Sequence, residues 1–464
     1  MIFSSLIYLF FFFLIVLLAY YLVPRKLKNL CLVIFSLAFY AWGEPVYVVL
    51  MILTILVDFC CGLLIGRFSE RRGAARAIVL GNVLINLGLL AWFKYAGMLV
   101  STFDQITGLG VSIPEVALPI GISFYTFESI SYSVDVYRKE APPMKNIINF
   151  ATYLSFFPHL VAGPIVRYEK LQAQVVQRQE TLEKFTAGMM RFCQGVFKKV
   201  LLANNLAGLA ERVQYMGNPS TPEAWMGILA YTFQIYFDFS GYSDMAIGLG
   251  MMFGFELPEN FDHPYISRSV SEFWRRWHMT LGGWFREYVY IPLGGNRHGK
   301  LSTVRNLAIV WVLTGLWHGA SWNFAFWGAY YAVLIICEKL FLGKLLEKTP
   351  VFIQWLYTFL AAVIGWVFFS YTDIGAAFRV LAAMFGFPGS GTDSLGVYAL
   401  LTYGATMLIA AVCSTPAAGN LLEKLRTSGK PGKVIWCTGF LVLFVVSIAF
   451  LVDNSYNPFL YAKF

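Results

Sequence analysis

Apolar residues follow one another in long blocks along most of the 464-residue chain. A helix needs roughly 20 predominantly apolar residues to cross a bilayer. The pattern therefore predicts an all-α polytopic membrane protein, with about 11–13 transmembrane or re-entrant helices. The apolar blocks lie at residues 2–23, 30–43, 45–66, 76–95, 117–136, 148–166, 224–252, 304–318, 322–341, 353–371, 396–415 and 434–452, with a more amphipathic segment at 196–213.

Two of these blocks need an interpretation beyond their length. Block 2–23 has no basic residue before it and is too long for a signal peptide, so it predicts a retained first helix. Block 148–166 fits either a full span or a short re-entrant helix, which hydropathy does not distinguish. No internal repeat or low-complexity linker is visible, so residues 1–464 are interpreted as a single membrane domain.

The composition supports a membrane protein and excludes several other classes. Hydrophobic residues make up 58% of the chain and charged residues 13%, whereas about 25% charged is usual in soluble proteins. A soluble enzyme, a disordered chain and a disulfide scaffold are thereby excluded. The net charge of +9 is explained by positively charged cytoplasmic loops, which are usual in membrane proteins. Lipid, and not nucleic acid, is therefore the expected partner. An outside N-terminus places every lysine and arginine on the cytoplasmic side except Lys94, Arg212, Arg379 and Lys463.

A polar interruption carries His318, between two apolar blocks. A helix that enters from the cytoplasm near Val304 would place this imidazole about 21 Å into a hydrocarbon core of about 30 Å. An ionisable residue at that depth usually faces the bundle interior or a wet cavity. Thr314 and Gly315 lie one turn back and leave room for a neighbour. His318 is thus either a hydrogen-bonded link between helices or a general base in a tunnel.

The segment from Ser271 to Tyr288 contains His278 and divides cleanly when it is drawn as one helix. Its aromatic side chains occupy one face and its arginines the other, with His278 at the edge of the aromatic face. This pattern predicts a helix at the membrane surface, which Gly282 and Gly283 would bend or break. The arginines at a cytoplasmic mouth are candidates to bind the phosphates of a donor such as coenzyme A. They are Arg275, Arg276 and Arg286.

Further polar stretches interrupt the apolar blocks, at residues 119–129, 157–167 and 236–244. Each is expected to line an interior cavity or to pack through hydrogen bonds between helices. Asp238 and Asp244 are six residues apart and not on one helical face, and the seven cysteines lack ligand spacing, so no metal site is expected. With the two histidine blocks, these stretches supply the candidate tunnel residues, which are Trp277, Trp317, Asn323, Asp244 and Ser240.

These residues together resemble the membrane-bound O-acyltransferases, in the branch that contains the bacterial alginate O-acetylase. The teichoic-acid D-alanylation membrane protein is a more distant relative. The resemblance covers essentially the whole chain, and the two histidine blocks in combination are its most specific part. It is carried by Pro119 to Phe127, Leu160 to Arg167, Phe237 to Gly248, Phe261 to Gly295, Leu316 to Gly319 with Trp322 to Phe324, and Asn454 to Phe459.

The resemblance implies a bundle with a funnel through the membrane, His318 as the intramembrane catalytic histidine and His278 as the second histidine. It also implies cytoplasmic acetyl-CoA as the donor, with no metal. An extracytoplasmic polysaccharide or a partner acetyl carrier would be the acceptor, with a partner acetyltransferase protein outside the bacterial inner membrane. We therefore expect a membrane O-acetyltransferase, with His318 as the base.

Three alternatives remain open on the sequence alone. The acyl donor could be a chain on a carrier protein, as in D-alanylation. The chain could instead be a non-enzymatic transporter with a histidine proton relay, although many transporters contain repeats that this sequence lacks. A scaffold that anchors a secreted acetylase is the third alternative.

Overall fold

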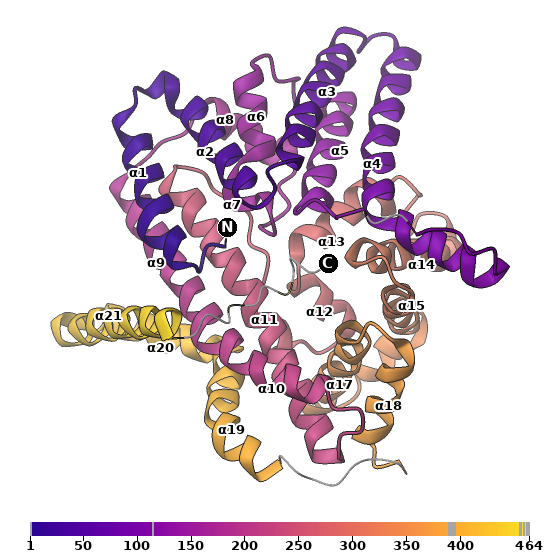
Figure 1. Ribbon diagram of the computed structural model, residues 1–464, viewed down its shortest axis with the longest axis vertical. Helices are drawn as coiled ribbons and strands as arrows, with labels where there is room; N and C mark the ends of the chain where they lie inside the picture. Colours follow the sequence, from indigo (N-terminus) through magenta and orange to yellow (C-terminus); the bar gives the residue numbers. More distant parts are fainter. Residues whose placement is uncertain (1, 114–115, 388–395, 454–456, 458–459, 461–464) are drawn as a thin grey trace. The chain divides into compact units, whose positions relative to one another are not determined.

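The computed structural model describes residues 2–113, 116–387, 396–453, 457 and 460, and these residues form helices and connecting segments without a strand (Figure 1). This confirms the predicted all-α class.

Contacts divide the chain into two compact units. Unit 1 comprises Met1–Phe192 and Ser243–Pro258, and unit 2 comprises Cys193–Tyr242 and Glu259–Phe464. Two helices, α9 (Leu182–Phe197) and α11 (Thr221–Met252), contribute residues to both units.

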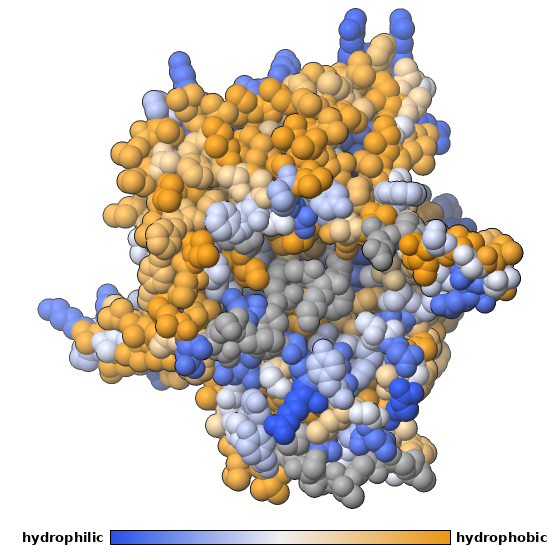
Figure 2. Space-filling view, in the orientation of Figure 1, coloured by the Kyte–Doolittle hydropathy of each residue, from blue (hydrophilic) through white to orange (hydrophobic). Residues whose placement is uncertain are grey.

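Unit 1 contains the N-terminal helices. A π-helical turn, Tyr8–Phe12, precedes α1, and α3, α4 and α5 contact one another. Figure 2 shows hydrophobic side chains gathered over the region that Figure 1 labels α1 to α4, with hydrophilic side chains beyond the ends of α3 and α4. The bounds are α1 Phe13–Leu22, α2 Lys28–Gly43, α3 Tyr47–Arg67, α4 Arg72–Thr107, α5 Ile122–Arg138, α6 Ile147–Ser155, α7 Phe157–Leu160 and α8 Tyr168–Val176.

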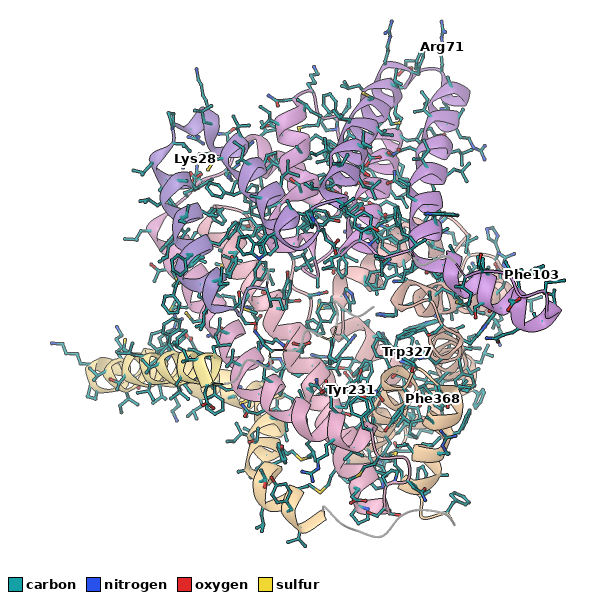
Figure 3. All side chains as sticks on the ribbon, in the orientation of Figure 1. Lys28, Arg71, Phe103, Tyr231, Trp327 and Phe368 are labelled. Carbon is teal, nitrogen blue, oxygen red and sulfur yellow. The ribbon has the colours of Figure 1, made fainter. Side chains whose placement is uncertain are left out.

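Unit 2 contains the helices that carry both predicted histidines, and α14 packs closely along α15. Its aromatic core includes Tyr231 from α11, Trp327 from α15 and Phe368 from α17 (Figure 3). The bounds are α10 Asn204–Gln214, α12 Val270–Arg276, α13 Met279–Phe285, α14 Gly299–His318, α15 Trp322–Cys337, α16 Gly343–Leu346, α17 Val351–Ser370, α18 Ile374–Met384, α19 Gly396–Cys413, α20 Pro416–Thr427 and α21 Gly429–Asp453.

The predicted apolar blocks coincide with helices. Among the residues that the structure describes, six helical segments are long and apolar enough to cross a membrane by length and composition. Two shorter apolar helices accompany them, Tyr8–Leu22 and Ile374–Met384. The chain is therefore a multi-pass membrane protein, whereas the expected number of crossings stays a prediction. The six segments are Tyr47–Arg67, Arg72–Thr107, Trp322–Leu346, Val351–Ser370, Gly396–Cys413 and Gly429–Asp453.

Block 148–166 folds as two short helices, α6 and α7, followed by irregular backbone. The nine residues of α6 cover about 13 Å, less than half of a hydrocarbon core of about 30 Å. Side chains from within unit 1 satisfy the backbone beyond it. Glu128 accepts the Val166 N–H at 3.1 Å, and Tyr153 donates its hydroxyl to the Val166 carbonyl at 3.0 Å. Block 148–166 is therefore not one continuous membrane-spanning helix, and its re-entrant character stays a prediction.

Helices α9 and α11 approach each other at glycines and are joined by ion pairs. In unit 1, a Cβ on Gly248 would lie 2.5 Å from the Gly188 carbonyl oxygen, and Arg191 pairs with Asp244 at 2.7 Å. In unit 2, a Cβ on Gly241 would lie 2.8 Å from the Gly195 carbonyl oxygen. A π-helical turn, Lys198–Ala203, follows α9 and brings Lys199 within 2.6 Å of Asp238. Small residues thus permit close packing, and each buried charge has a partner.

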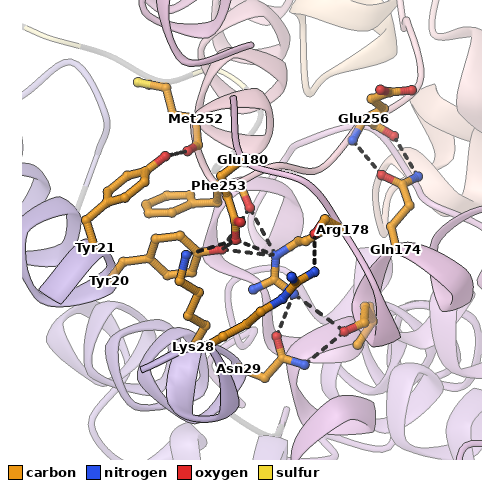
Figure 4. Close-up of polar contacts among 12 residues, drawn as sticks. Tyr20, Tyr21, Lys28, Asn29, Gln174, Arg178, Glu180, Met252, Phe253 and Glu256 are labelled. Carbon is orange, nitrogen blue, oxygen red and sulfur yellow. Dashed lines mark hydrogen bonds and ion pairs between the residues drawn. The ribbon is translucent and has the colours of Figure 1, made fainter. Parts of the chain in front are cut away.

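A polar node in unit 1 joins chain segments that are far apart in the sequence (Figure 4). Arg178 donates from Nε to the Tyr20 hydroxyl and to the Phe253 carbonyl, both at 3.0 Å, and from Nη1 to Asn29 at 2.7 Å. Glu180 accepts the Tyr20 hydroxyl proton at 2.6 Å and pairs with Lys28 at 3.1 Å. The node therefore ties the ends of α1 and α11 to the start of α2.

The close glycine contact of α9 with α11 gives a stability prediction. In Gly248→Val, the new side chain would meet the backbone of Gly188 and Phe192, and overpacking of this kind costs about 1–3 kcal/mol. We expect a lower unfolding temperature of the detergent-purified protein, measured by intrinsic fluorescence. Gly439→Val in α21 is the control, because nothing lies within 4 Å of a Cβ there. Equal unfolding temperatures for the two variants would contradict the packing argument.

Candidate active site

His318 is the last residue of α14, and its imidazole is buried among aromatic rings in unit 2. The rings of Trp317, Trp327 and Phe369 lie edge-on to it, with centroids 5.0, 5.0 and 5.2 Å away. The helix ends here because the backbone turns extended at Gly319 before α15 begins at Trp322. The predicted polar interruption between two apolar blocks is confirmed.

Gly315 and Gly328 allow α14 and α15 to approach closely. A Cβ on Gly315 would collide with the Phe324 carbonyl oxygen, and one on Gly328 would collide with the Trp311 carbonyl oxygen. The room at Gly315 that the sequence analysis expected is therefore occupied by a neighbouring helix.

A cavity of about 210 Å³ lies beside α14 in unit 2. Its α14 wall is formed by residues three or four positions apart, which share one face of a helix. His318 follows Thr314 by four positions and therefore continues this face. The remaining walls come from α12, α13 and the π-helical turn Arg286–Tyr290. The lining residues are Trp274, Trp277, His278, Leu281, Gly282, Phe285, Arg286, Tyr290, Leu307, Val310, Trp311 and Thr314.

The single surface helix predicted over residues 271–288 is wrong. The helix breaks at Trp277 and His278, and His278 takes a left-handed conformation with φ 45°. Segment 260–262 binds the backbone freed by this break: Asp262 donates its N–H to the Arg276 carbonyl, and Met279 donates its N–H to the Asn260 carbonyl, both at 2.9 Å. A helical projection assumes unbroken backbone, so it did not anticipate this pairing. Gly282 and Gly283 instead lie within the continuous helix α13.

The break turns His278 into the protein, so that it is only 1% exposed. Its ring lies edge-on to Phe239, with centroids 4.7 Å apart, and its Nδ1 lies 3.1 Å from Oδ1 of Asn260. Burial lowers the pKa of His278 to about 3, because the charged form loses its hydration. The imidazole is therefore neutral at physiological pH.

Trp317 brings the two histidines into one aromatic cluster. Its ring centroid lies 5.8 Å from that of His278 and 5.0 Å from that of His318. Trp277 is also buried, and its ring stacks on Phe273 and packs against Trp366, with centroids 5.6 and 4.7 Å away. These two tryptophans, predicted as tunnel residues, are thus core aromatics that border the histidines.

The three predicted arginines differ in their surroundings. Arg286 lines the cavity and pairs with its neighbour Glu287 at 3.1 Å. Arg276 is held by Asp262 at 2.7 Å and Glu272 at 3.0 Å. Arg275 is exposed and does not line the cavity. Only Arg286 therefore lies where the charge of a ligand in the cavity would meet it.

The other predicted tunnel residues do not line this cavity. Asn323, at the start of α15, donates to the carbonyl oxygens of Phe368 and Tyr371 at 3.3 and 2.8 Å, which ties α15 to the end of α17. Ser240 is buried on α11. Asp244 belongs to unit 1, where Arg191 neutralises it. The contacts of Asn323 and Asp244 are those of residues that hold helices together.

Asn260 is the residue of the site that the sequence reasoning missed. It is fully buried, and its Oδ1 lies near His278, the Thr280 hydroxyl and the Thr280 N–H. One signal was available, because Asn260 directly precedes the block that begins at Phe261. An asparagine in a connecting segment nevertheless has many ordinary uses, so nothing in the sequence linked it to His278.

The fold and the site define a multi-pass helical membrane protein with a partly open, largely apolar cavity that is lined by an imidazole and a guanidinium. Among the residues that the structure describes, no three histidine, cysteine, aspartate or glutamate side chains are grouped as metal ligands.

Comparisons with known proteins identify the family. Residues 3–378 match the model of MBOAT, the membrane-bound O-acyltransferase family. The chain is 42% identical to the probable alginate O-acetylase AlgI of Pseudomonas putida over all of both chains. It is 33% identical to the peptidoglycan O-acetyltransferase of Helicobacter pylori over 84% of this chain and 80% of that one. It is 30% identical to the teichoic acid D-alanyltransferase of Bacillus subtilis, over 48% and 59%.

The chain belongs to the membrane-bound O-acyltransferase family, and it is an acyltransferase. This confirms the resemblance seen in the sequence and sets aside the non-enzymatic transporter and the scaffold.

The cavity gives a prediction with a matched control. Gly282 lines the cavity and is exposed, and a Cβ there would meet only the Trp274 carbonyl oxygen at 3.8 Å. Gly282→Leu should therefore fill the cavity without disturbing the fold. We expect acyl transfer to fall about tenfold or more in kcat/KM, which corresponds to about 1.4 kcal/mol per tenfold change.

Gly283→Leu is the control for this prediction, because Gly283 does not line the cavity and nothing lies within 4 Å of a Cβ there. Both variants should unfold at the wild-type temperature. Equal activity of the two variants would show that the cavity is not used.

Proposed function

We propose that the chain transfers an acetyl group from cytoplasmic acetyl-CoA to a hydroxyl of an extracytoplasmic polysaccharide, or to a partner acetyl carrier, in the inner membrane of a bacterium. The observation that carries the proposal is the cavity of about 210 Å³ with apolar walls, His278 among its lining residues and Arg286 as its one lining guanidinium. Two relatives over most of this chain's length are named as O-acetylating enzymes, one of alginate and one of peptidoglycan.

The cavity suits the chemical character of a coenzyme A thioester. The thioester and much of its pantetheine arm are uncharged and would lie against Leu281, Phe285 and Val310. The phosphates of the nucleotide end need a cation, and a guanidinium binds phosphate through directed hydrogen bonds. Arg286 is the lining residue that can serve this purpose. Arg276 is less suited, because it does not line the cavity and two carboxylates, Asp262 and Glu272, bind it.

In the proposed reaction, His318 removes the proton of the acceptor hydroxyl while the hydroxyl oxygen attacks the acetyl carbonyl carbon. The carbon–sulfur bond breaks, and the proton passes from His318 to the departing thiolate, which leaves as coenzyme A. General base catalysis typically contributes about 10²–10⁴-fold, so positioning by the surrounding walls has to supply a large further part. The rings around His318 exclude water, which would otherwise compete with the acceptor.

A carrier protein remains the second candidate for the acyl donor. The similarity to the teichoic acid D-alanyltransferase supports it, although that similarity covers only 48% of this chain. The two donors are distinguished by whether acetyl-CoA alone is consumed. The acceptor is proposed to be an alginate-like or cell-wall polysaccharide, and a partner acetyltransferase outside the membrane would complete its modification.

The first test measures coenzyme A release from acetyl-CoA by the protein in liposomes, with an acceptor polysaccharide present. Wild type should release coenzyme A, and His318→Ala should reduce kcat by about 10²-fold or more, as expected for loss of a general base. His298→Ala is the control, because His298 is exposed and does not line the cavity. Normal turnover by folded His318→Ala would contradict the assigned role, and a lack of turnover in wild type would favour a carrier-bound donor.

Recognition of the donor's phosphates gives a second prediction. Loss of a hydrogen bond to a charged group costs about 1.5–3 kcal/mol, so Arg286→Gln should raise the KM for acetyl-CoA about tenfold or more. The KM for acetyl-pantetheine, which lacks the nucleotide, should not change. Arg297→Gln is the control, since Arg297 is exposed and outside the cavity lining. A similar rise for both donors would assign Arg286 to packing.

A further inference from the structure

We infer that Asn260 selects one tautomer of His278: the imidazole carries its proton on Nδ1 and holds the lone pair on Nε2. Nε2 of His278 therefore accepts a hydrogen bond or a proton. It cannot donate, because it carries no hydrogen. The inference deepens the proposed function and rests on it, because His278 has to face a substrate for its tautomer to matter. Asn260 is thereby a positioning residue, which acts on substrate through the histidine.

The first step is to identify the atom of Asn260 that faces the histidine. An asparagine side chain can present either its oxygen or its nitrogen, and the choice is decided by the groups around it. The Thr280 backbone N–H lies 3.3 Å from Oδ1, and the Thr280 hydroxyl lies 2.9 Å from the same atom. A backbone N–H can only donate. The atom at this position must therefore be the carbonyl oxygen of Asn260.

The second step concerns the ring itself. Nδ1 of His278 lies 3.1 Å from the Asn260 oxygen, which can only accept. Nδ1 must therefore carry a proton to make this contact. A neutral imidazole has one N–H, and its other nitrogen is an acceptor. The lone pair consequently lies on Nε2.

The third step is that the ring stays neutral. Asn260 is an uncharged partner, unlike the carboxylate that supports an imidazolium in many catalytic sites. The side chains packed on the ring from α11 and α14 are Phe239 and Trp317, which carry no charge, and Thr280 faces it through Asn260. Burial accordingly lowers the pKa of His278 to about 3.

Asn260 also explains how the His278 ring is held in place. His278 has φ 45°, in the left-handed region that is unfavourable for a non-glycine residue. Such a conformation persists only where the surroundings determine it. The backbone carbonyl of Asn260 accepts the Met279 N–H at 2.9 Å, and its side-chain oxygen contacts Nδ1 of His278. The same residue therefore binds both the backbone after the break and the imidazole.

The tautomer restricts what His278 can do in acetyl transfer. A lone pair at Nε2 suits a hydrogen-bond donor on the substrate, either the acceptor hydroxyl or an amide N–H of the pantetheine arm. The ring cannot polarise the acetyl carbonyl by donating a hydrogen bond from Nε2. In the proposed reaction, His278 therefore orients a donor group and does not act as an oxyanion hole.

The tautomer can be measured without any activity. Wild-type protein labelled with ¹⁵N-histidine would be compared with His278→Gln, to assign the His278 resonances in the NMR spectrum. We expect one protonated nitrogen, Nδ1, and one unprotonated nitrogen, Nε2, at pH 7. A proton on Nε2 would overturn the inference. This measurement holds even if acetyl-CoA proves to be the wrong donor, so its failure is distinguishable from failure of the proposed function.

The second experiment is the pH profile of acetyl transfer by Asn260→Asp. A carboxylate beside Nδ1 stabilises the imidazolium and raises the pKa of His278 from about 3 towards its ordinary value near 6.5. Protonation then removes the Nε2 lone pair, so the rate of the variant should fall as the pH drops from about 7 to 5. The wild-type profile should show no such loss from His278.

Thr280→Val is the matched control for the pH profile. It removes the hydroxyl that also bonds to Asn260 but keeps the backbone N–H and leaves the partner of His278 uncharged. Its profile should keep the wild-type shape, whatever its rate. An Asn260→Asp profile with the wild-type shape, in a folded variant, would overturn the role of Asn260.

Discussion

The structure depends on one constraint: a polar group inside this apolar chain has to find its partner within the protein. The backbone bonds of helices meet this condition, which is why almost every apolar block became a helix. Irregular backbone occurs where side chains or the backbone of another segment replace the missing bonds. Glu128 and Tyr153 bind Val166 beyond the short helix α6, and Asn260 and Asp262 bind the break before His278. In each case the departure from helix is held by a small set of buried polar contacts.

The same constraint shapes the electrostatics of the interior. Lys199 pairs with Asp238, and Arg191 pairs with Asp244, so that buried charges are neutralised locally. His278 instead has an uncharged amide as its partner and remains neutral. The partners of these buried ionisable residues thus differ: the two cations pair with carboxylates, whereas His278 contacts a neutral amide. Asp244, chosen from the sequence as a tunnel residue, is one of these carboxylates.

Close packing gives the site its rigidity. Gly315 and Gly328 bring α14 and α15 together, and Trp317 joins the rings of the two histidines. A rotation of α14 would therefore displace both His318 and the cavity wall at Thr314. A bulkier residue at either glycine would change the geometry of the site although neither glycine lines the cavity. This accounts for the strong pattern of small and aromatic residues in the block around Leu316 to Phe324.

The sequence by itself determined the all-α membrane class, the positions of the helices and the family, because hydrophobic periodicity and the histidine blocks are local features of the chain. It also placed His318 in a polar interruption between two apolar blocks. Only the tertiary structure decided where the helix breaks at His278, which arginine reaches the cavity, and that Asn260 binds the imidazole. These outcomes depend on contacts between segments distant in the sequence, and in the case of Asn260 on the need to satisfy freed backbone groups. A helical projection of residues 271–288 treats that segment in isolation, so it had no means of including the pairing with residues 260–262.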